Sequence, residues 1–598
     1  MGLRALSGSP LLADLILLGL LAYHCKALEL QRVVSMVRLR RCNMFSLRHS
    51  GESGFVFRSF SDPTILMDNF LTWLIESRSN VTWPAPGISL LRVSVEDNDR
   101  GLRSRQGLPP DSCCLSIPVD DLRLILTPAR CVNFLNLCGC FGWDCEPHTL
   151  ADPLHVLMLF VFHLVTCPPS CPLRSIWAPY LAILPTEYTD PVFVFTADFD
   201  LYENFKPYKH SSLQPMDVHS AITKIMHRYH FAWCTLLPLL SKAGFCDNMD
   251  SDQPPSDFAW AWSTVNSRCV HCKLPPFNPE DLSNACAKLF NSLPVRRNSI
   301  RFKVTSQSDE HISLIPFFDL LNHDPLVSSV PLGFDPGQNS IRLTLQHSLA
   351  TDQQDVVQVS FSRCNTDFRC WEDLALNRTA WRKTIRTGVR KFNEQLLRGR
   401  GRYAREPSVP QVYINYGPHD NLSLFTEYGF CLKPGANPHD AVYPTYADLQ
   451  NLSEAMRKPQ AVEAFHAVLQ RLKLNVPQLS CITTPVTWPT VCFTSCGPSY
   501  YLLVLLYAIH VIEKRVANSH EKKSILLSSS DPLYELAEET LEPVVHVLVN
   551  TLIISMREQI VAYQKMLSLL CVQSCAADFL NHFKLLLQCK QHILDSLI

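Results

Sequence analysis

The stretch Ile-Pro-Phe-Phe-Asp-Leu-Leu-Asn-His-Asp, residues 315–324, is an apolar run that ends in polar side chains. If its end is helical, Asp319 and Asn322 lie one turn apart and their side chains are neighbours. Taken alone, the stretch is typical of a buried strand that runs into an Asn/Asp turn. A second stretch, Tyr-Ile-Asn-Tyr-Gly-Pro-His-Asp-Asn at 413–421, changes this interpretation, because the two belong to one pattern.

Together with Glu-Tyr-Gly-Phe at 427–430, these stretches resemble the C-terminal half of a SET domain of the RuBisCO large-subunit methyltransferase type. Three earlier segments also follow the order of that family. They are Arg-Gly-Leu at 100–102, Ser-Ile-Trp-Ala-Pro-Tyr-Leu at 175–181, and Trp-Ala-Trp-Ser-Thr-Val-Asn-Ser-Arg at 260–268. The ordered set is more specific than any one segment, and no glycine-rich dinucleotide loop or phosphate-binding loop in the sequence competes with it.

The resemblance implies an α+β fold, in which a SET-domain β core carries a helical insertion and an all-α C-terminal domain follows. We expect an N-terminal extension over 1–67, which can be disordered, a SET domain over 68–440 and a helical substrate-binding-like domain over 441–598. Within the SET domain, the helical insertion covers about 127–310 and a long basic loop covers about 345–408.

Apolar periodicity predicts several helices directly from the residues. Before residue 440 these are 70–77, 154–165, 216–245 and 258–268. After residue 440 they are 500–516, 534–570 with an interruption at Pro543, and 577–597.

The composition excludes some classes of protein. With 598 residues, 47% of them hydrophobic and 18% charged, the chain is long enough for roughly two to four packed domains. The net charge of -1 gives no general attraction to nucleic acid or to anionic membranes. The 24 cysteines are scattered, which favours buried free thiols over a disulfide scaffold. Cys131, Cys138, Cys140, Cys145 and His148 are zinc-ligand types, but their spacing is irregular, so we predict no metal.

The N-terminal apolar run at residues 15–23 is too short to span a bilayer of about 30 Å. A signal peptide is the alternative for this segment, although no clear cleavage site follows it. We therefore expect no membrane span. The family resemblance implies a location in the cytoplasm, the nucleus or both, and we expect a monomer. The basic tract over 382–405 is interpreted as a solvated face, with a nucleosome contact or a nuclear-import signal as the alternatives.

The resemblance also assigns roles to site residues. Six residues would hold S-adenosylmethionine: Arg100, Gly101, Leu102, Arg268, Asn322 and His323. Tyr416 would be the catalytic residue at the transfer point, while Asp319 and Tyr428 would shape the side that receives the lysine. From the residues alone, Arg268 could equally be an ordinary cation at a helix end.

The implied activity is that of a protein-lysine N-methyltransferase acting on a histone or a non-histone protein. A lysine with an ordinary pKa near 10.4 must lose its proton first, and an apolar channel beside a sulfonium favours the neutral amine. Two alternatives stay open at this point. The chain could be a catalytically weak SET-fold interaction protein, or it could methylate histidine.

Overall fold

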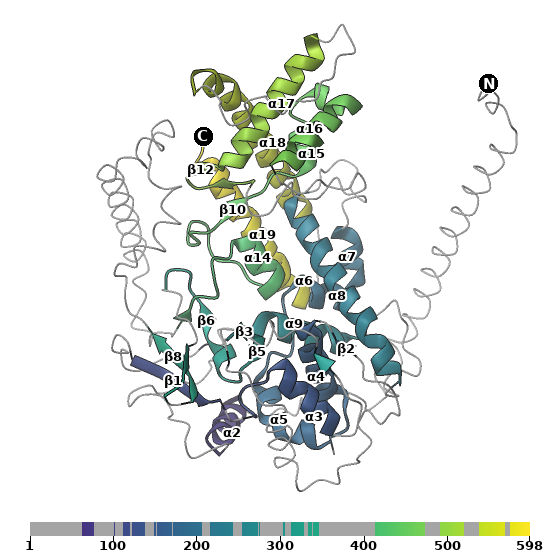
Figure 1. Ribbon diagram of the computed structural model, residues 1–598, viewed down its shortest axis with the longest axis vertical. Helices are drawn as coiled ribbons and strands as arrows, with labels where there is room; N and C mark the ends of the chain where they lie inside the picture. The colour runs from purple at the N-terminus through teal and green to yellow at the C-terminus, as the bar shows by residue number, and fades with distance from the viewer. Residues whose placement is uncertain are drawn as a thin grey trace, which may run out of the picture. The chain divides into compact units, whose positions relative to one another are not determined.

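In the computed structural model of the protein (Figure 1), the following parts of the chain are described. They are residues 63–76, 101, 112–119, 122–137, 149–150, 152–169, 171–205, 216–242, 254–272, 274, 303–304, 312–327, 333–337, 339–345, 413–472, 491–518, 538–568 and 574–598.

Helices dominate the first half of the described chain. They are α2 (Pro63–Glu76), α3 (Pro128–Leu137), α4 (Pro153–Thr166), α5 (Pro172–Ile183), α6 (Pro191–Ala197), α7 (Phe199–Phe205), α8 (Asp217–Lys242) and α9 (Ser256–Arg268). The helices predicted at 154–165, 216–245 and 258–268 are confirmed as α4, α8 and α9.

Local sequence explains where these helices begin. α4 and α6 each start with an Asp-Pro pair, in which the aspartate is the N-cap and the proline is the first helical residue. Asp152 accepts a hydrogen bond from Leu154 N at 2.9 Å, and Asp190 accepts from Val192 N at 3.0 Å. The aspartate satisfies a backbone donor that has no partner within the helix, and proline has no N–H to satisfy.

α4 is the central helix of this half. Every side chain from His155 to Leu164 is buried, because α3, α5, α8 and α9 all pack against the helix. At its side, Trp177 of α5 is fully buried, with ring centroids 4.9 Å from Phe134 and 5.3 Å from Phe160. The Trp-Ala-Pro-Tyr-Leu segment is therefore part of the core, as the sequence resemblance implies.

The strands are short and form small separate sheets. β1 (Ser112–Pro118), β8 (Ser340–Leu345) and β7 (Gly333–Asp335) form an antiparallel sheet in that order, with Ile117 opposite Ile341. β3 (Cys269–His271) pairs antiparallel with β5 (Ile312–Leu314). Two pairs are parallel: β2 (Thr149–Leu150) with β4 (Lys303–Val304), and β6 (Asn322–His323) with β9 (Tyr413–Ile414). This mixture of helices and short strands is compatible with the predicted α+β class.

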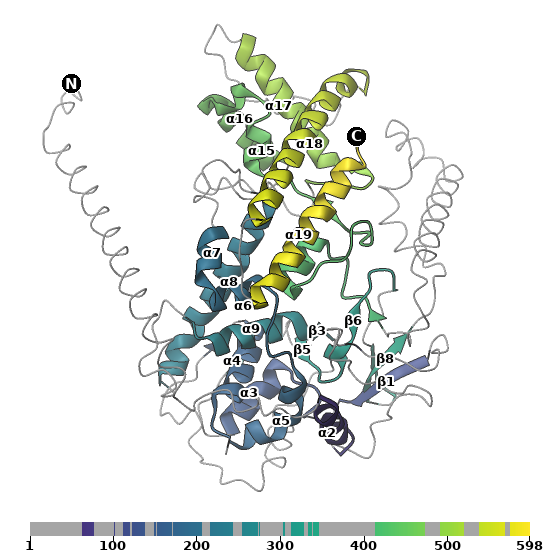
Figure 2. The ribbon, with the colours of Figure 1, turned by 180° about the vertical axis from the view of Figure 1, so that it is seen from behind.

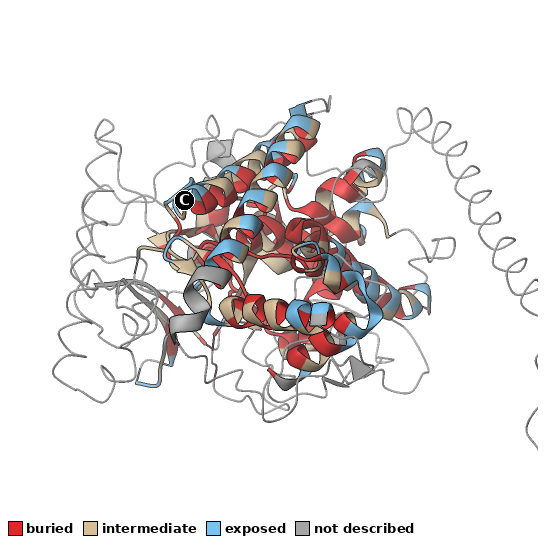
Figure 3. Ribbon diagram, turned by 90° about the horizontal axis from the view of Figure 1, so that it is seen from above, coloured by how far each residue is buried: buried red, intermediate tan, exposed pale blue. Residues whose placement is uncertain are grey.

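The chain after β9 is mostly helical, and its elements are as follows. They are α14 (Asn421–Ser423), the π-helix η6 (Leu424–Tyr428), α15 (Tyr446–Gln450), η7 (Glu454–Arg457), α16 (Pro459–Arg471), α17 (Tyr500–Asn518), α18 (Glu538–Ser568) and α19 (Ser574–Asp595). Figure 3 shows the buried faces of these helices turned inward and their exposed faces turned outward.

Two details of this region differ from the sequence predictions. It is not purely helical, since β10 (Ala441–Val442), β11 (Phe493–Thr494) and β12 (Gly497–Pro498) form a small antiparallel sheet. A strand of two residues is too short to show an alternation of apolar and polar side chains, so the sequence pattern does not predict it. The predicted interruption at Pro543 is also wrong, because α18 runs through it. That proline lies only six residues into the helix, so it removes a single intrahelical hydrogen bond near the end.

α18 also contains the segment Val545–Ser568, which is long and apolar enough to cross a membrane by length and composition. In the structure α18 packs against α15, α17 and α19. Its Gln559 donates a hydrogen bond to Asp448 of α15 at 2.6 Å, and its Arg557 pairs with Asp595 of α19 at 2.8 Å. These contacts are those of a helix within a protein bundle.

α19 joins the C-terminal helices to earlier parts of the chain. It lies beside α6, as Figure 2 shows, and it also contacts α14. The ring of Phe579 lies 5.2 Å from both Phe195 of α6 and Phe425 of η6. Lys590 of α19 pairs with Asp217, the first residue of α8, at 2.6 Å, and each side chain is only 1% exposed.

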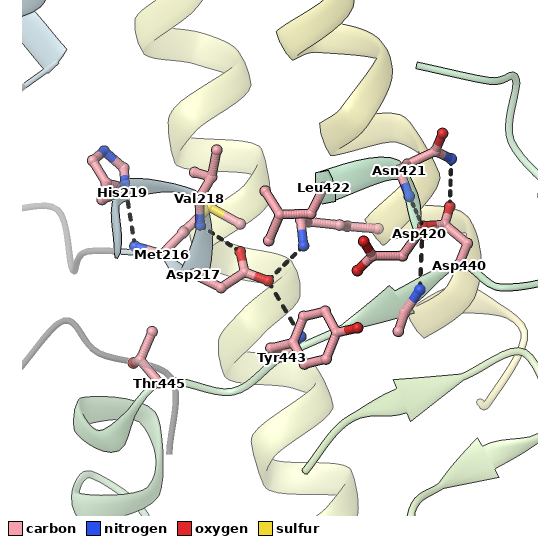
Figure 4. Close-up of polar contacts among 12 residues, drawn as sticks. Met216, Asp217, Val218, His219, Asp420, Asn421, Leu422, Asp440, Tyr443 and Thr445 are labelled. Carbon is pink, nitrogen blue, oxygen red and sulfur yellow. Dashed lines mark hydrogen bonds and ion pairs between the residues drawn. The ribbon is translucent and has the colours of Figure 1, made fainter. Parts of the chain in front are cut away.

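Polar contacts continue from this buried pair toward β10 (Figure 4). The Asp217 carboxylate also accepts from the backbone of Val218 at 2.8 Å and of Tyr443 at 3.3 Å. Beside them, Asp440 accepts from the side chain of Asn421 at 2.7 Å. The Asp217 charge thus has one cation and two backbone donors, which is what a buried carboxylate needs.

We predict that Lys590→Met destabilises the protein by about 3–5 kcal/mol, because it leaves the buried Asp217 carboxylate without its cation. Arg557→Gln is the matched control, since its partner Asp595 is 43% exposed and such surface pairs contribute about 0–1 kcal/mol. Urea unfolding of both variants measures the difference. The double variant Asp217→Leu/Lys590→Met should recover most of the loss. Equal losses in Lys590→Met and Arg557→Gln would contradict the prediction.

Candidate active site around Tyr416

The parallel pairing of β6 with β9 brings together the two stretches that the sequence singled out. Asn322 is opposite Tyr413, His323 is opposite Ile414, and Asp324 N donates to Ile414 O at 3.0 Å. About ninety residues separate the paired strands in sequence. A parallel pair always requires a long connection, so this one is set by tertiary structure and not by a local turn.

Tyr416, two residues after β9, is fixed to the first stretch by two hydrogen bonds. Its backbone N–H donates to His323 Nδ1 at 3.0 Å, and its hydroxyl donates to the Leu321 carbonyl at 2.7 Å. The rings of Tyr416 and His323 stack at 5.0 Å. Burial raises the pKa of Tyr416 well above its usual range, so the phenol stays protonated. With its proton directed at Leu321, the hydroxyl oxygen presents its lone pairs elsewhere.

The turn after Tyr416 depends on its neighbours in sequence. Asn415 Oδ1 accepts from Gly417 N at 2.8 Å, and Asn415 Nδ2 donates to the Val327 carbonyl at 3.1 Å. Gly417 has φ +131°, a conformation that side chains with a Cβ rarely adopt. The Asn-Tyr-Gly order therefore fixes the backbone on both sides of Tyr416.

The His323 ring is neutral, and its own Nε2–H group is a buried hydrogen-bond donor. Its Nδ1 accepts from Tyr416, so the ring proton lies on Nε2. This Nε2 atom is buried and has no hydrogen-bond partner within the described residues. Burial lowers the pKa of His323 to about 4, and the charges of His419 and His439 lower it further in the same direction. A buried N–H without an acceptor is uncommon in proteins, and an ordered water or a ligand can satisfy it.

Arg268, at the end of α9, lies in a buried polar cluster with Asp319. Its Nη1 donates to the Asp319 carbonyl at 2.9 Å and to Asp319 Oδ2 at 3.1 Å, and its Nε donates to Tyr188 at 3.3 Å. Tyr180 of α5 donates to the same Oδ2 at 2.8 Å. Burial raises the pKa of Asp319, and the hydrogen bonds from Arg268 and Tyr180 oppose that rise.

This cluster alters the interpretation of Asp319. The residue was expected on the lysine side, but its side chain has no exposed surface, whereas 14% of the Arg268 side chain is exposed. In this arrangement the carboxylate contacts Arg268 and Tyr180 directly and orients the guanidinium. A direct contact between Asp319 and a substrate stays a prediction.

Tyr428 ends the π-helix η6 beside Tyr416, with ring centroids 5.2 Å apart. The ring also lies 5.6 Å from His419 and 6.3 Å from Phe430. π-helical turns are rare in proteins, and those that occur are often found at functional sites. Tyr416, Tyr428, His419, His323 and Phe430 thus form one aromatic cluster, which we call the aromatic wall.

The residue before Tyr428 anchors this turn to α9. Asn266 Nδ2 donates to the Glu427 carbonyl at 3.0 Å and to its Oε2 at 2.7 Å, while Arg228 pairs with Oε1 at 2.8 Å. Asn266 and Arg268 both belong to the last turn of α9. One helix end therefore holds both the Tyr428 turn and the segment that carries Asp319.

Sequence reasoning missed four of these positioning residues: Tyr180, Tyr188, Asn266 and Glu427. Tyr180, Asn266 and Glu427 fall within quoted motif segments, so their place in a pattern was the available signal. Tyr188 had no signal.

Several predicted residues lie outside this cluster or outside the described chain. Gly101 is described and buried. Arg100, Leu102, the basic tract 382–405 and the apolar run 15–23 lie outside the described residues, so their assigned roles stay predictions. The same holds for the first cysteine cluster, of which only Cys131 is described.

These contacts unite the stretches that the sequence attributed to a SET domain, and comparison with known proteins supports that class. The chain is similar to SET domain-containing protein 4 of Mus musculus, with 26% identity over 377 residues, which is 63% of this chain and 60% of that protein. It is also similar to SET domain-containing protein 4 of Homo sapiens, with 26% identity over 344 residues, 58% of this chain and 54% of that protein.

A third relative is SET domain-containing protein 4 of Artemia parthenogenetica, 28% identical over 182 residues, which is 30% of this chain and 25% of that protein. The matches therefore span at most 60% of these relatives. No protein-family model matches the chain. Together the matches support a SET-domain protein similar to SET domain-containing protein 4. The RuBisCO methyltransferase subclass rests on the quoted motifs alone.

We predict that Gly429→Ala is more destabilising than Gly435→Ala. Both glycines have left-handed φ angles, +78° and +72°, which cost a residue with a Cβ about 1–2 kcal/mol. At Gly429 the new Cβ would also lie 2.7 Å from the backbone N of Asp190, while at Gly435 it meets only the His592 side chain at 3.1 Å. Thermal unfolding tests this difference, and similar losses in both variants would contradict the tight packing of the Tyr428 turn.

We predict that the protein loses stability through His323 as the pH falls from about 6.5 to about 4. The pKa of this histidine is about 4 when folded and near 6.5 when unfolded, so over this range the unfolded chain binds the extra proton. The His323→Asn variant lacks this group, and its free energy of unfolding should fall less steeply with acidification. Because burial also lowers the pKa of His219 to about 4, only the difference between wild type and variant is informative. Parallel pH profiles would refute the assignment.

Proposed function

We propose that this protein is a protein-lysine N-methyltransferase that uses S-adenosylmethionine. The observation that carries the proposal is the attachment of Tyr416 to residues 321–323 by two hydrogen bonds. A tyrosine held in this way, with its proton directed at a backbone carbonyl, is a preorganised polar group next to a buried ligand position. The motif resemblance and the similarity to SET domain-containing protein 4 support the same function.

The residues present fit S-adenosylmethionine. His323 Nε2–H is a buried donor without an acceptor among the described residues, and it matches the need of a polar ligand such as an adenine ring or a carboxylate. The Arg268 side chain is 14% exposed, and a guanidinium suits recognition of a carboxylate. The residues that would hold the cofactor are Arg268, His323, Asn322 and Gly101. When bound, S-adenosylmethionine supplies an activated methyl group.

The aromatic wall suits the other substrate, a lysine side chain. Its rings offer apolar surface to a hydrocarbon chain and attract an ammonium group at the chain end by cation–π interaction. The low dielectric of such a site also favours the neutral amine, which is the form that accepts a methyl group. Tyr416 and Tyr428 stay protonated, since burial raises the pKa of both, to about 12 for Tyr428.

Tyr416 would therefore contribute to the reaction by orienting the substrate amine. Its hydroxyl oxygen accepts a hydrogen bond from the amine and aligns the nitrogen lone pair for an in-line displacement. Alignment of reacting groups contributes up to ~7–11 kcal/mol in well-oriented systems. Because the hydroxyl cannot rotate without losing its bond to Leu321, this alignment requires no reorganisation during the reaction.

We predict that Tyr416→Phe lowers turnover about a hundred- to a thousandfold, since one preorganised polar contact in the transition state is worth ~2.7–4 kcal/mol. Binding of S-adenosylmethionine, measured by calorimetry, should change little. Tyr446→Phe is the matched control, because it also removes a buried hydroxyl with a hydrogen bond, to His466 at 3.0 Å, far along the chain. Near-normal turnover of Tyr416→Phe would refute the assignment.

The activity itself is tested with the full chain, S-adenosylmethionine carrying a tritiated methyl group, and a cell lysate as the mixture of acceptors. Incorporation that depends on Tyr416, followed by mass spectrometry that places the methyl group on lysine, is the expected result. A methyl group on histidine would establish the other reaction. Cofactor binding without incorporation would favour a SET-fold interaction protein.

A further inference from the structure

A second group of reactive side chains lies at the corner between α4 and α5. His163 is in the last turn of α4, Cys167 is its C-cap, and Cys171 is the N-cap of α5. The three residues are 1%, 1% and 7% exposed. One ligand atom from each residue, a ring nitrogen or a sulfur, lies within 4.8 Å of the other two.

The local sequence His-Leu-Val-Thr-Cys-Pro-Pro-Ser-Cys, residues 163–171, explains this convergence. His163 and Cys167 are four residues apart, so they lie on one face of the helix end. Two prolines then stop the helix, and Cys171 N donates to the Pro168 carbonyl at 2.8 Å. This tight turn brings the second thiol back beside the imidazole, with Sγ 3.9 Å from His163 Nε2.

The distance between Cys171 Sγ and His163 Nε2 is close to that in a tetrahedral zinc site. With Zn–N near 2.05 Å and Zn–S near 2.3 Å, ligand atoms around zinc are about 3.6–3.8 Å apart. The observed 3.9 Å between Cys171 Sγ and His163 Nε2 differs from this by a few tenths of an ångström. Two thiolates and a neutral imidazole would cancel the charge of Zn²⁺, which is the condition for burying the ion.

The simpler interpretation is that both cysteines act as small apolar residues in the core. It accounts for the thiols, but it gives no role to the zinc-ligand side chain beside them, a histidine that is only 1% exposed. Arg174 is also buried at this corner, and its Nη1 donates to the Cys167 carbonyl at 2.5 Å. A cation beside this corner favours ionised thiols over neutral ones.

We propose that His163, Cys167 and Cys171 bind one zinc ion and that this ion fixes the α4–α5 corner. Within the described residues no fourth protein ligand lies close to these three. A water molecule or another donor would therefore occupy the fourth coordination position. The corner matters to the candidate active site, because α5 carries both Trp177 of the core and Tyr180, which binds Asp319. The site is separate from the first cysteine cluster, where irregular spacing argued against a metal.

The zinc content of the purified full chain, measured by mass spectrometry of the metal, tests the proposal. We expect about one zinc ion per chain in the wild type and its loss in Cys167→Ser and Cys171→Ser. Cys131→Ser is the matched control, since that thiol is equally buried in α3 but lies outside the cluster. Wild-type protein that holds no zinc after dialysis against zinc, or equal loss in the control, would overturn the proposal.

Replacement by Co²⁺ gives a test that does not depend on the folding of variants. Wild-type protein loaded with cobalt should show the thiolate-to-cobalt charge-transfer absorption of a two-cysteine site with tetrahedral geometry. A cobalt spectrum without that absorption would exclude the two thiols as ligands. Peptide mapping that finds Cys167 and Cys171 joined in a disulfide in the purified protein would also overturn the proposal.

Discussion

The hydrogen bonds from Tyr416 to Leu321 and His323 hold the candidate active site together. They join two stretches about ninety residues apart in the sequence, and each stretch alone is too short to be stable. The strands they extend contain only two residues each, so these side chain-to-backbone bonds add to a short backbone ladder. The same bonds fix the tautomer of His323 and the direction of the Tyr416 proton, which are the two properties that a binding site here requires.

Buried charges provide the second constraint on the architecture. Arg268 with Asp319 fixes the end of α9 against the Phe318–Leu320 turn, and Lys590 with Asp217 fixes α19 against α8. A buried ion pair adds little to net stability, but removal of one partner is costly. Such pairs therefore select one arrangement of the helices over others. Here they connect α8 and α9, the candidate site and the last helix of the chain.

Much of the secondary structure followed from local sequence. α4, α8 and α9 were predicted from apolar segments of the right length, and Asp-Pro pairs account for the start of α4 and α6. The short sheet β10–β12 and the passage of α18 through Pro543 were not predicted. Two-residue strands have no periodicity of their own, and a proline near a helix start is tolerated when the neighbouring helices bury the rest.

The sequence by itself named four residues of the candidate site, because the ordered motifs contain Arg268, Asn322, His323 and Tyr416. It could not determine what each of them contacts. Only the tertiary structure decided that the Tyr416 hydroxyl bonds to a backbone carbonyl and that Asp319 is enclosed by Arg268 and Tyr180. It also brought together His163, Cys167 and Cys171, although spacings of four residues were visible in the sequence. The physical reason is that hydrogen bonds and desolvation act across space, while sequence patterns report only neighbours along one element.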